Sequence, residues 1–467
     1  MSLDIEQPRS LERQRSWERK RPEAPQQQTY DLVCIGFGTT ALPLAASLAD
    51  KDSNSRILFV ERRSQWDWQP AHVLPDKQVG SSFLRDLVTT QNPRSSYTFV
   101  NFLHATNQLI RFANNSKLSP SRRLMAQYFR WAAGKVEQLG WVRYGQEAAR
   151  VQPVRADGTA KVAKWAVELR SSKTKAQSSI FAKRVVFACG AQAHVPEALA
   201  RAPLVLHSSQ TDRLLENVGS SKRPLNMAIV GADQEAAEIF EHLSGPQEQA
   251  HGKHSATIFY ADSALRPDDG SPKMQDLLSR PESASGSVPP EIRQGQSATP
   301  TVDLNTLEEI YAAQYTQKIH ERDSAKWRFQ MKSHSEVVGT QREAEKVRLV
   351  LRNPQTNETS VSERAFDMVI AATGYSFAID RSLVDIPVGL LDGGVVQVDR
   401  EYRVNFRRGV LAPGNGVWLL GSLEDRKVRN DDFSWAAERA QRVSKSIVAA
   451  VAKEEKSAEQ GGERAMF

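Results

Sequence analysis

The chain has 467 residues and a formal net charge of +7, from 62 lysines and arginines against 55 aspartates and glutamates. With 40% hydrophobic and 25% charged residues, it cannot be wholly disordered or collagen-like, and at roughly 100–200 residues per domain its length predicts two to four domains. The positive charge is spread along the chain in mixed-sign runs, which favours anionic small molecules over nucleic acid as partners.

Two cysteines, Cys34 and Cys189, are too few for a disulfide framework or a multi-cysteine zinc site. Both lie in apolar, strand-like runs, so buried and inert thiols are expected. No apolar stretch reaches the roughly 18 residues that would cross a bilayer, and the N-terminus lacks the apolar segment of a signal peptide. We expect a protein of a reducing compartment, the cytoplasm by default, with no membrane partner and no metal.

The chain begins with a polar segment, residues 1–28, which has few large apolar groups and is predicted to be a disordered tail. A buried strand at 32–35, a helix over 41–50 and a strand at 57–60 then form a β-α-β unit, the start of a doubly wound sheet. Interrupted helices are predicted over 103–140.

A second strand-turn-helix unit consists of a strand at 227–230, a helix over 234–243 and a strand at 256–260. Residues 266–303 are crowded with proline, glycine, serine and aspartate and predict a long loop. The other predicted elements are the hairpins 161–167 with 176–181 and 347–351 with 360–364, the strands 185–188 and 368–372, and a last helix over 433–453.

The first motif is Gly36-Phe37-Gly38-Thr39-Thr40-Ala41, directly between a strand and a helix. Glycines at these positions let the backbone turn sharply and approach a pyrophosphate at the positive N-terminus of the helix. Glu61, at the end of the next strand, can accept hydrogen bonds from a ribose diol. Glycine can also serve packing alone in such a turn, but the β-α-β context favours a dinucleotide site at Gly36, Gly38, Ala41 and Glu61.

A second motif covers 366–375, a buried strand that ends in Ala372-Thr373-Gly374. Residues 185–190 are a fainter copy of it. In flavoproteins with two dinucleotide domains such strands return to the FAD sheet after the hairpins, and Thr373 and Gly374 would then pass close to the cofactor. The alternative is a buried strand and turn with no ligand.

With these motifs in place, the sequence resembles the class B flavin N-hydroxylating monooxygenases, the ornithine and lysine N-monooxygenases of hydroxamate siderophore biosynthesis. The resemblance covers nearly all of residues 29–450. Its most specific segments are 82–87, 92–95, 99–103, 128–131, 207–209, 236–240, 262–267, 310–311, 372–375 and 402–404.

The resemblance implies an α/β fold with two dinucleotide-binding, Rossmann-like domains, a discontinuous FAD domain and β-hairpin insertions. It divides the chain into an FAD-binding part over 29–215, an NADP-type domain over 216–345, a return to the FAD domain over 346–453 and a flexible tail over 454–467.

The implied reaction uses FAD, NADPH and dioxygen to place one oxygen atom on a neutral amine. The expected partners are therefore a small-molecule amine substrate and dioxygen, in siderophore-like or specialised metabolism. The resemblance also places Trp68 and Gln69 by the flavin, and Gly231 and Gln234 at an NADPH site. It allows a homo-oligomer, because family members are often tetramers.

The NADPH turn departs from the family pattern, because Asp233 stands where the family has its second glycine. At an effective dielectric near 20, two unit charges about 4 Å apart interact by ~4 kcal/mol, so an ionised Asp233 would weaken pyrophosphate binding. The family's arginine for the 2′-phosphate is Ala261 here. FAD is therefore the expected cofactor, and the use of NADPH stays open.

The substrate positions also depart from the family, which predicts an amine other than ornithine. Arg85 replaces a lysine, Gln275 lies near an aligned asparagine, and Trp435 replaces a small serine. Arg85 has two interpretations: it binds a substrate carboxylate, as a catalytic-site residue, or it forms a surface ion pair with Asp86. Asp431 either orients the flavin or amine, or is a solvated loop carboxylate.

Alternative functions follow from these departures. The chain is either an N-hydroxylase or a repurposed flavoprotein with a degenerate NADPH site, acting as an oxidase, a non-redox cyclase or isomerase, or a non-catalytic pathway partner. A nucleic-acid-binding protein ranks far below both, because it rests only on the net charge and the arginine-rich tail.

Overall fold

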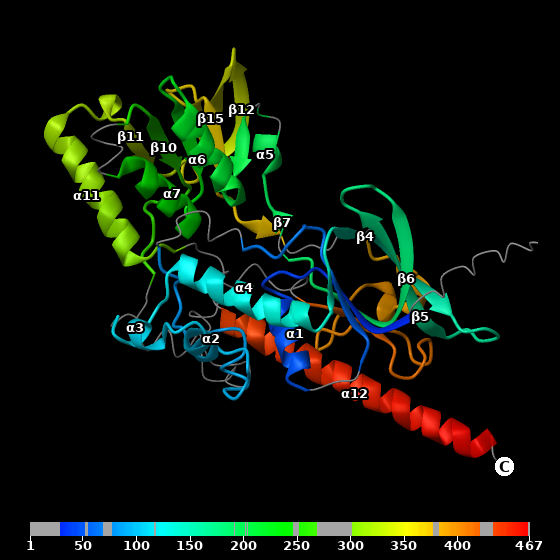
Figure 1. Ribbon diagram of the computed structural model, residues 1–467. Coiled ribbons are helices and arrows are strands. Elements are labelled where there is room, and N and C mark those ends of the chain that lie inside the picture. The colour runs from blue at the N-terminus through cyan, green and yellow to red at the C-terminus, as the bar shows by residue number, and fades with distance from the viewer. Residues whose placement is uncertain are drawn as a thin grey trace, which may run out of the picture.

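The computed structural model describes residues 29–51, 55–68, 77–115, 118–190, 192–200, 202, 204–245, 252–268, 301–376, 383–420 and 433–465. Within them the chain forms two α/β units (Figure 1), each built on its own sheet. Three of the predicted site residues, Gln69, Gln275 and Asp431, lie outside the described residues.

The larger unit is built on a seven-stranded sheet in the order β3-β2-β1-β6-β5-β4, with β17 also paired to β6. Its parallel part brings together β1, β2, β3, β17 and the second half of β6, and the predicted hairpin of β5 and β6 extends it with antiparallel strands. The strands are β1 (Thr29–Ile35), β2 (Ile57–Val60), β3 (Val142–Arg143), β4 (Gln146–Arg155), β5 (Val162–Ser171), β6 (Gln177–Phe187) and β17 (Gly416–Leu419).

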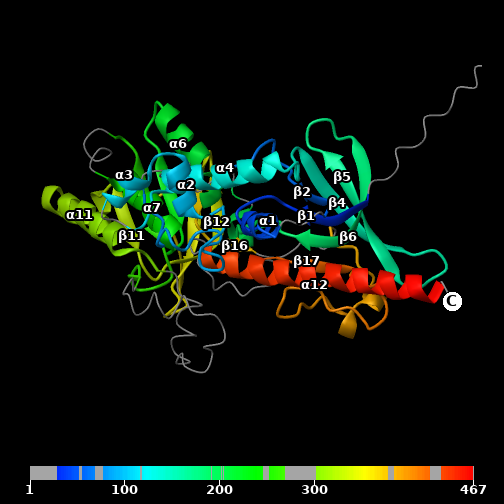
Figure 2. The same ribbon diagram turned by 60° about the horizontal axis from the view of Figure 1, so that its bottom comes forward.

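Helices cover one face of this sheet (Figures 1 and 2). They are α1 (Leu42–Ala49), α4 (Arg122–Gln138) and α12 (Phe433–Ala465), with the shorter α2 (Phe99–Ala105) and α3 (Leu109–Ala113) beside α4. Apolar side chains of these helices and of the sheet form one continuous core, as the alternation of strands and amphipathic helices requires.

The last helix is longer than the sequence predicted. Residues 454–465, expected to be a flexible tail, continue α12 as far as Ala465. The extension is held against the sheet, because the Glu454 carboxylate pairs with Lys183 at 2.6 Å and also with Arg184, both on β6. A helix of good helix formers that gains such a partner has no reason to end at Lys453.

The smaller unit has a five-stranded sheet, in the order β11-β10-β9-β15-β8, in which every pair is parallel. Its strands are β8 (Val205–His207), β9 (Asn226–Val230), β10 (Ser255–Phe259), β11 (Phe329–Lys332) and β15 (Met368–Ala371). Its helices are α5 (Glu197–Ala200), α6 (Thr211–Ser220), α7 (Gln234–Ser244) and α11 (Leu304–His320). A separate antiparallel sheet of β12 (Glu336–Glu343), β13 (Lys346–Arg352) and β14 (Thr359–Val361) packs on it through Val347 and Leu349.

The prediction that the strand over 368–372 returns to the larger sheet is wrong. β15 pairs with β9 and with β8 in the smaller sheet, and β17 is the strand that returns to the larger one. The smaller sheet thus draws strands from both sides of the predicted 216–345 segment. A short, fully apolar strand suits the centre of either sheet, so its sequence does not select the partner.

Two chain segments connect the units side by side. β7 (Gln192–Ala193) pairs antiparallel with β16 (Tyr375–Ser376), and the amide of His194 donates to the carbonyl oxygen of Gly374 at 3.0 Å. Because β7 follows β6 of the larger sheet and β16 follows β15 of the smaller one, this short ribbon joins the two sheets.

A buried ion pair holds the units together away from this ribbon. The Arg122 guanidinium, at the start of α4, donates to both carboxylate oxygens of Glu238 on α7, at 2.7 and 2.9 Å. The two side chains are 9% and 4% exposed. Lys77 and Glu241 form a second pair beside it at 2.8 Å. We call these two pairs the interdomain clamp.

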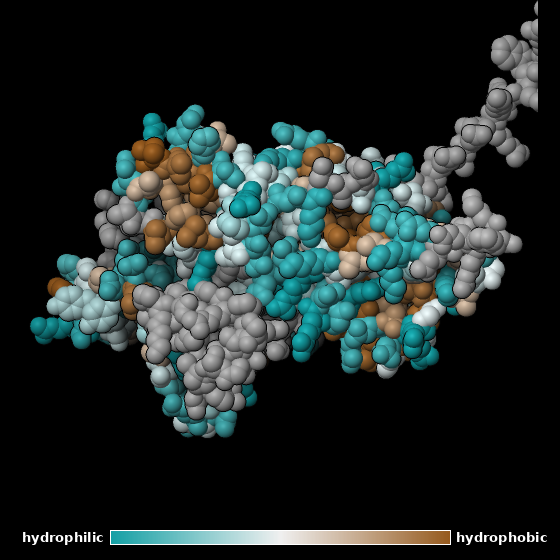
Figure 3. Space-filling model, turned by 90° about the horizontal axis from the view of Figure 1, so that it is seen from below, coloured by the Kyte–Doolittle hydropathy of each residue, from teal (hydrophilic) through white to brown (hydrophobic). Residues whose placement is uncertain are grey.

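The surface seen from below, the side along which α12 runs in Figure 1, shows separate apolar clusters between hydrophilic residues (Figure 3). Among the described residues, no helix combines the length and the apolar character that crossing a membrane would require.

The clamp makes a stability prediction. Replacing Arg122 with alanine leaves the Glu238 carboxylate buried without its partner, and breaking a buried pair in this way costs about 3–5 kcal/mol. Urea unfolding of R122A should show that loss. R123A, at the exposed neighbouring position of the same helix, should change the free energy of unfolding by less than about 0.5 kcal/mol. Equal effects of the two substitutions would contradict a structural role for the clamp.

Candidate functional site

The first glycine turn lies at the carboxyl edge of the larger sheet, between β1 and α1. Gly36 has φ +98°, and a Cβ there would lie 2.4 Å from the carbonyl oxygen of Ala188, at the end of β6. Gly38 differs, because a Cβ at that position would meet no protein atom within 4 Å. Gly36 is therefore required by the backbone itself, whereas Gly38 leaves open space in front of the turn.

In the helical turn that follows, the amides of Ala41 and Leu42 donate to the carbonyl oxygen of Gly38 and Pro43 has no N–H, so donors for a ligand must come from the residues before Ala41. The carbonyl oxygen of Gly38 accepts from the Leu42 amide at 3.0 Å, so the first turn begins at Gly38. The helix has no side-chain cap, and Ala41 at its start is fully buried. An uncapped N-terminus that faces open space is suited to an anion.

Glu61 stands at the same edge, directly after β2. One carboxylate oxygen accepts from the Phe37 amide at 2.9 Å and the other from the Arg63 amide at 3.0 Å. A carboxylate has about four acceptor sites, so two bonds leave capacity for a ligand. The structure thus brings Gly36, Gly38, Ala41 and Glu61 together, as their spacing predicted.

The second glycine turn repeats the backbone of the first. Gly231 has φ +148°, and a Cβ there would lie 2.0 Å from the carbonyl oxygen of Ala372, at the end of β15. The carbonyl oxygen of Asp233 accepts from the Ala237 amide at 3.0 Å. Gly231 and Asp233 therefore correspond to Gly36 and Gly38.

The side chain of Asp233 makes the second turn chemically different. Its carboxylate accepts from the Ala236 amide at 2.9 Å and so caps α7. Burial, followed by the nearby Glu235 carboxylate, raises the pKa of Asp233 to about 7. The equivalent amide of the first turn, that of Ala41, donates instead to the carbonyl oxygen of Gly38 at 3.1 Å, so the second turn differs in having a carboxylate where the first has open space.

Glu235 adds a second carboxylate to this turn, which the sequence analysis missed. It accepts from the Ser208 hydroxyl at 2.5 Å and from the Tyr375 hydroxyl at 3.1 Å. Burial first, and then Glu235, raises the pKa of the Tyr375 phenol. An acidic residue two positions after Asp233 was visible in the sequence, but its partners come from β16 and from the turn after β8.

Other predicted cofactor residues have contacts within the protein. The side chain of Gln234 bonds to Glu238 at 2.9 Å and to Asp303, the capping residue of α11, and so ties α7 to α11. Thr373 donates to the carbonyl oxygen of His194 in the connecting ribbon. Gly374 lies in the same ribbon, where its carbonyl oxygen contacts the His207 ring at 2.9 Å. Cofactor contacts of these residues stay predictions.

The aromatic residues predicted near the flavin and substrate lie close to the start of α12. Trp68 is 8% exposed. Its ring packs edge-on against those of Phe129 and Phe433, with ring centroids 5.1 and 5.8 Å apart. Trp435, two residues after Phe433, is partly exposed. Trp68 is thus part of the core, and Trp435 belongs to the segment that packs on it.

Arg85 is half-buried on the loop before α2, and its neighbour Asp86 is fully buried. The Asp86 carboxylate accepts from the amides of Val88 at 2.9 Å and Phe99 at 2.6 Å. The interpretation of Asp86 as a surface ion-pair partner is therefore wrong, because its oxygens organise the loop. Arg85 as a substrate ligand stays a prediction.

Cys189 also differs from expectation. Cys34 is buried, but Cys189 is exposed, because β6 ends at Phe187 and the chain leaves the sheet there. Its sulfur lies 3.9 Å from the carbonyl oxygen of Ile35, beside the first glycine turn.

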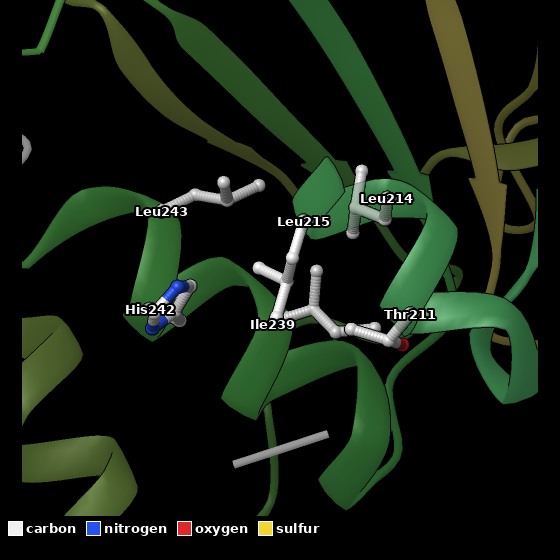
Figure 4. Close-up of a pocket in the computed structure, with 6 residues that line it drawn as sticks. All are labelled: Thr211, Leu214, Leu215, Ile239, His242 and Leu243. Atoms are coloured by element: carbon white, nitrogen blue, oxygen red, sulfur yellow. The ribbon is translucent and has the colours of Figure 1, made fainter. Parts of the chain in front are cut away.

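An apolar hollow lies between α6 and α7 (Figure 4), away from both turns. Its lining residues are Thr211, Leu214, Leu215, Ile239, His242 and Leu243. Its lining has no carboxylate, lysine or arginine to bind an amino acid, and it adds nothing to the site.

Comparisons with known proteins agree with this geometry. The family model described as L-lysine 6-monooxygenase/L-ornithine 5-monooxygenase matches residues 28–377. The chain is 30% identical over 437 residues to an L-ornithine N(5)-oxygenase of Arthrobotrys oligospora, covering 90% of this chain and 88% of that one. It is also 30% identical over 441 residues to an L-ornithine N(5)-monooxygenase of Ajellomyces capsulatus, covering 90% and 91%.

Solved structures show the same similarity. Ornithine hydroxylase PvdA of Pseudomonas aeruginosa has a TM-score of 0.75 and 26% identity, over 91% of this chain and 100% of that one. The ornithine N-hydroxylase KtzI of Kutzneria sp. 744, solved with reduced FAD, NADP+ and L-ornithine, has a TM-score of 0.76 and 25% identity, over 90% and 99%. The two glycine turns and these matches together show that the chain belongs to the L-lysine 6-monooxygenase/L-ornithine 5-monooxygenase family.

Proposed function

We propose that the protein is an FAD-dependent monooxygenase that N-hydroxylates a primary amine of an amino acid or a related metabolite. Family membership supports this reaction class. Within this chain, the proposal rests on the first glycine turn. There the uncapped start of α1 and the Glu61 carboxylate lie at one edge of the sheet.

The residues of the first turn fit FAD. The open space in front of Gly38 admits a pyrophosphate, the backbone amides of residues 38–40, just before α1, would donate to it, and Glu61 would accept from the ribose hydroxyls. FAD bound here would supply the oxygen-activating chemistry, while the protein orients the reactants and excludes water. Trp68 would contribute a buried aromatic wall on the α12 side.

The family implies NADPH as the reductant, and we include it in the proposal. In the conformation that the structure shows, an ionised Asp233 would lie against its pyrophosphate, so the second turn fits the dinucleotide only with this carboxylate uncharged. The Asp233 carboxylate occupies the Ala236 amide, and Glu235 places a further negative charge beside it.

Two substitutions support a substrate other than ornithine, although the relatives named above are ornithine enzymes. Arg85 replaces the family lysine on a loop that the buried Asp86 holds in place. A guanidinium binds a carboxylate through two parallel bonds that an ammonium cannot make. Trp435 replaces a small serine two residues after Phe433, and a side chain of its volume would reduce the space for a substrate.

The acidic second turn favours one alternative function, a flavoprotein that no longer uses NADPH. Asp233 and Glu235 are the observation behind it. Bleaching of the bound flavin by NADPH without oxygen would exclude this alternative.

The two glycines of the first turn predict different outcomes. G38A should leave the thermal unfolding of the FAD-free protein unchanged, because the new Cβ meets no protein atom. It should weaken FAD retention by about tenfold or more, because a methyl group enters the pyrophosphate path. G36A should lower the unfolding temperature, because its Cβ would collide with Ala188. The measurements are the ratio of flavin to protein absorbance and the melting curve. Normal FAD retention by G38A would place the cofactor elsewhere.

The amine substrate can be found with the FAD-loaded protein, NADPH, dioxygen and a panel of amines with and without a carboxylate. A product heavier by one oxygen atom is expected for a carboxylate-bearing amine. R85A should raise KM for that amine by about tenfold, the loss of a charge-assisted pair, while the rate of anaerobic flavin reduction stays unchanged. R85K keeps the positive charge but cannot form two parallel hydrogen bonds with a carboxylate, so its KM should lie between those of the natural protein and R85A. An equal loss with amines that lack a carboxylate would contradict this role for Arg85.

A further inference from the structure

The N-terminal turn of α7 carries acidic side chains at the place where the first turn has none. Asp233 caps the helix, and Glu235 lies in its first turn. Both belong to the nucleotide-type unit of the smaller sheet, and Gly231 before them makes the same kind of close approach to a carbonyl oxygen as Gly36, although its φ is +148° against +98°. The framework of a dinucleotide site is therefore retained while its electrostatic character is reversed.

The two carboxylates differ in how firmly they are held. Glu235 is fixed by two hydroxyl groups, those of Ser208 and Tyr375. Asp233 is held through the Ala236 amide of its own helix. A pyrophosphate that approaches this turn would therefore meet the Asp233 carboxylate at the start of the helix, while Glu235 is fixed by its two hydroxyl partners.

The surroundings of Asp233 oppose its ionisation. Glu235 and Glu238 on α7 are the charged groups that raise its pKa, after burial, and the Tyr375 phenol on β16 also interacts with it. Further out, Arg122 of α4 neutralises Glu238, His207 packs its ring against Tyr375 at 5.1 Å, and Asp303 meets Gln234.

The protonation state of Asp233 decides how dinucleotide binding at this turn depends on pH. Free Asp233 has a raised pKa of about 7, so it is mostly ionised at pH 8 and mostly protonated at pH 6. A bound pyrophosphate adds negative charge beside it and raises the pKa further. Binding above pH 7 must then be accompanied by proton uptake, and the protonated carboxyl group can donate a hydrogen bond to a phosphate oxygen.

We propose that a nicotinamide dinucleotide binds at the α7 N-terminus together with one proton, which the Asp233 carboxylate takes up, so that this unit is a proton-coupled nucleotide site. This inference rests on the proposed use of a nicotinamide dinucleotide. The first turn has no acidic side chain at the corresponding Gly38, and FAD binding carries no such coupling to this position.

The test is calorimetric titration of the FAD-loaded protein with NADP+ at pH 6 and pH 8, in two buffers of different ionisation enthalpy. With a pKa of about 7 for Asp233, the dissociation constant should rise about tenfold between these pH values. The difference in binding enthalpy between the two buffers at pH 8 should correspond to the uptake of close to one proton. The 2′-phosphate of NADP+ itself titrates near pH ~6, so the difference between the natural protein and D233N isolates the contribution of Asp233.

Two variants separate the effect of the Asp233 charge from the effect of the space that its side chain fills. D233N keeps an amide oxygen that can cap Ala236 but has no charge, and should bind NADP+ about tenfold more tightly at pH 8 with no proton uptake at this position. D233G reproduces the Gly38 turn and should bind at least as tightly, because glycine is tolerated at a helix start. The matched control is D323N, which removes the charge from the aspartate that caps a separate short helix, Ser324–Lys326, and should change neither quantity.

Equal affinity of the natural protein at pH 6 and pH 8, an unchanged proton count in D233N, or absence of NADP+ binding at pH 6 would each overturn the inference. The proposed function is tested separately, by reducing the flavin chemically and adding dioxygen and amine. An N-hydroxylated product in that experiment keeps the proposed reaction even if the proton coupling fails, and its absence counts against the reaction even if the coupling is found.

Discussion

The whole architecture depends on a close backbone contact that occurs twice. In the larger unit the turn after β1 passes against the carbonyl oxygen of Ala188, and in the smaller unit the turn after β9 passes against that of Ala372. Each contact needs a residue without a Cβ, and Gly36 and Gly231 supply it. Because the strand and helix on either side of each turn are fixed by this contact, it sets the edge at which a nucleotide can bind.

The same contact explains why two similar sequence segments recur. The segments 185–190 and 366–375 both end a buried strand at the carbonyl group that the glycine turn touches. They are equivalent parts of two sheets, each paired with the strand that precedes the glycine turn of its own unit. Their chemical roles then diverge, since the larger unit leaves its helix N-terminus open and the smaller one fills it with a carboxylate.

Hydrogen bonds and an ion pair connect the acidic turn of α7 to other elements of the molecule. Glu238, one helical turn after Gln234, forms the interdomain clamp with Arg122, and Tyr375, which holds Glu235, belongs to the ribbon between the sheets. The charge of Asp233 therefore interacts with Glu238 and Tyr375, which also belong to the contacts between the two units. This places the electrostatics of the second nucleotide site and the docking of the two units in one network.

Local sequence determined the two strand-turn-helix units, the hairpins and the glycine turn with Glu61, because turn geometry and hydrophobic period depend on residues close in the chain. Only the tertiary structure decided that β15 joins the smaller sheet, that α12 continues along β6, and that Cys189 is exposed. It also decided the partners of Glu235 and Glu238, which lie 140 and 116 residues away in sequence. Such contacts are selected by the packing of whole elements, and no local pattern encodes them.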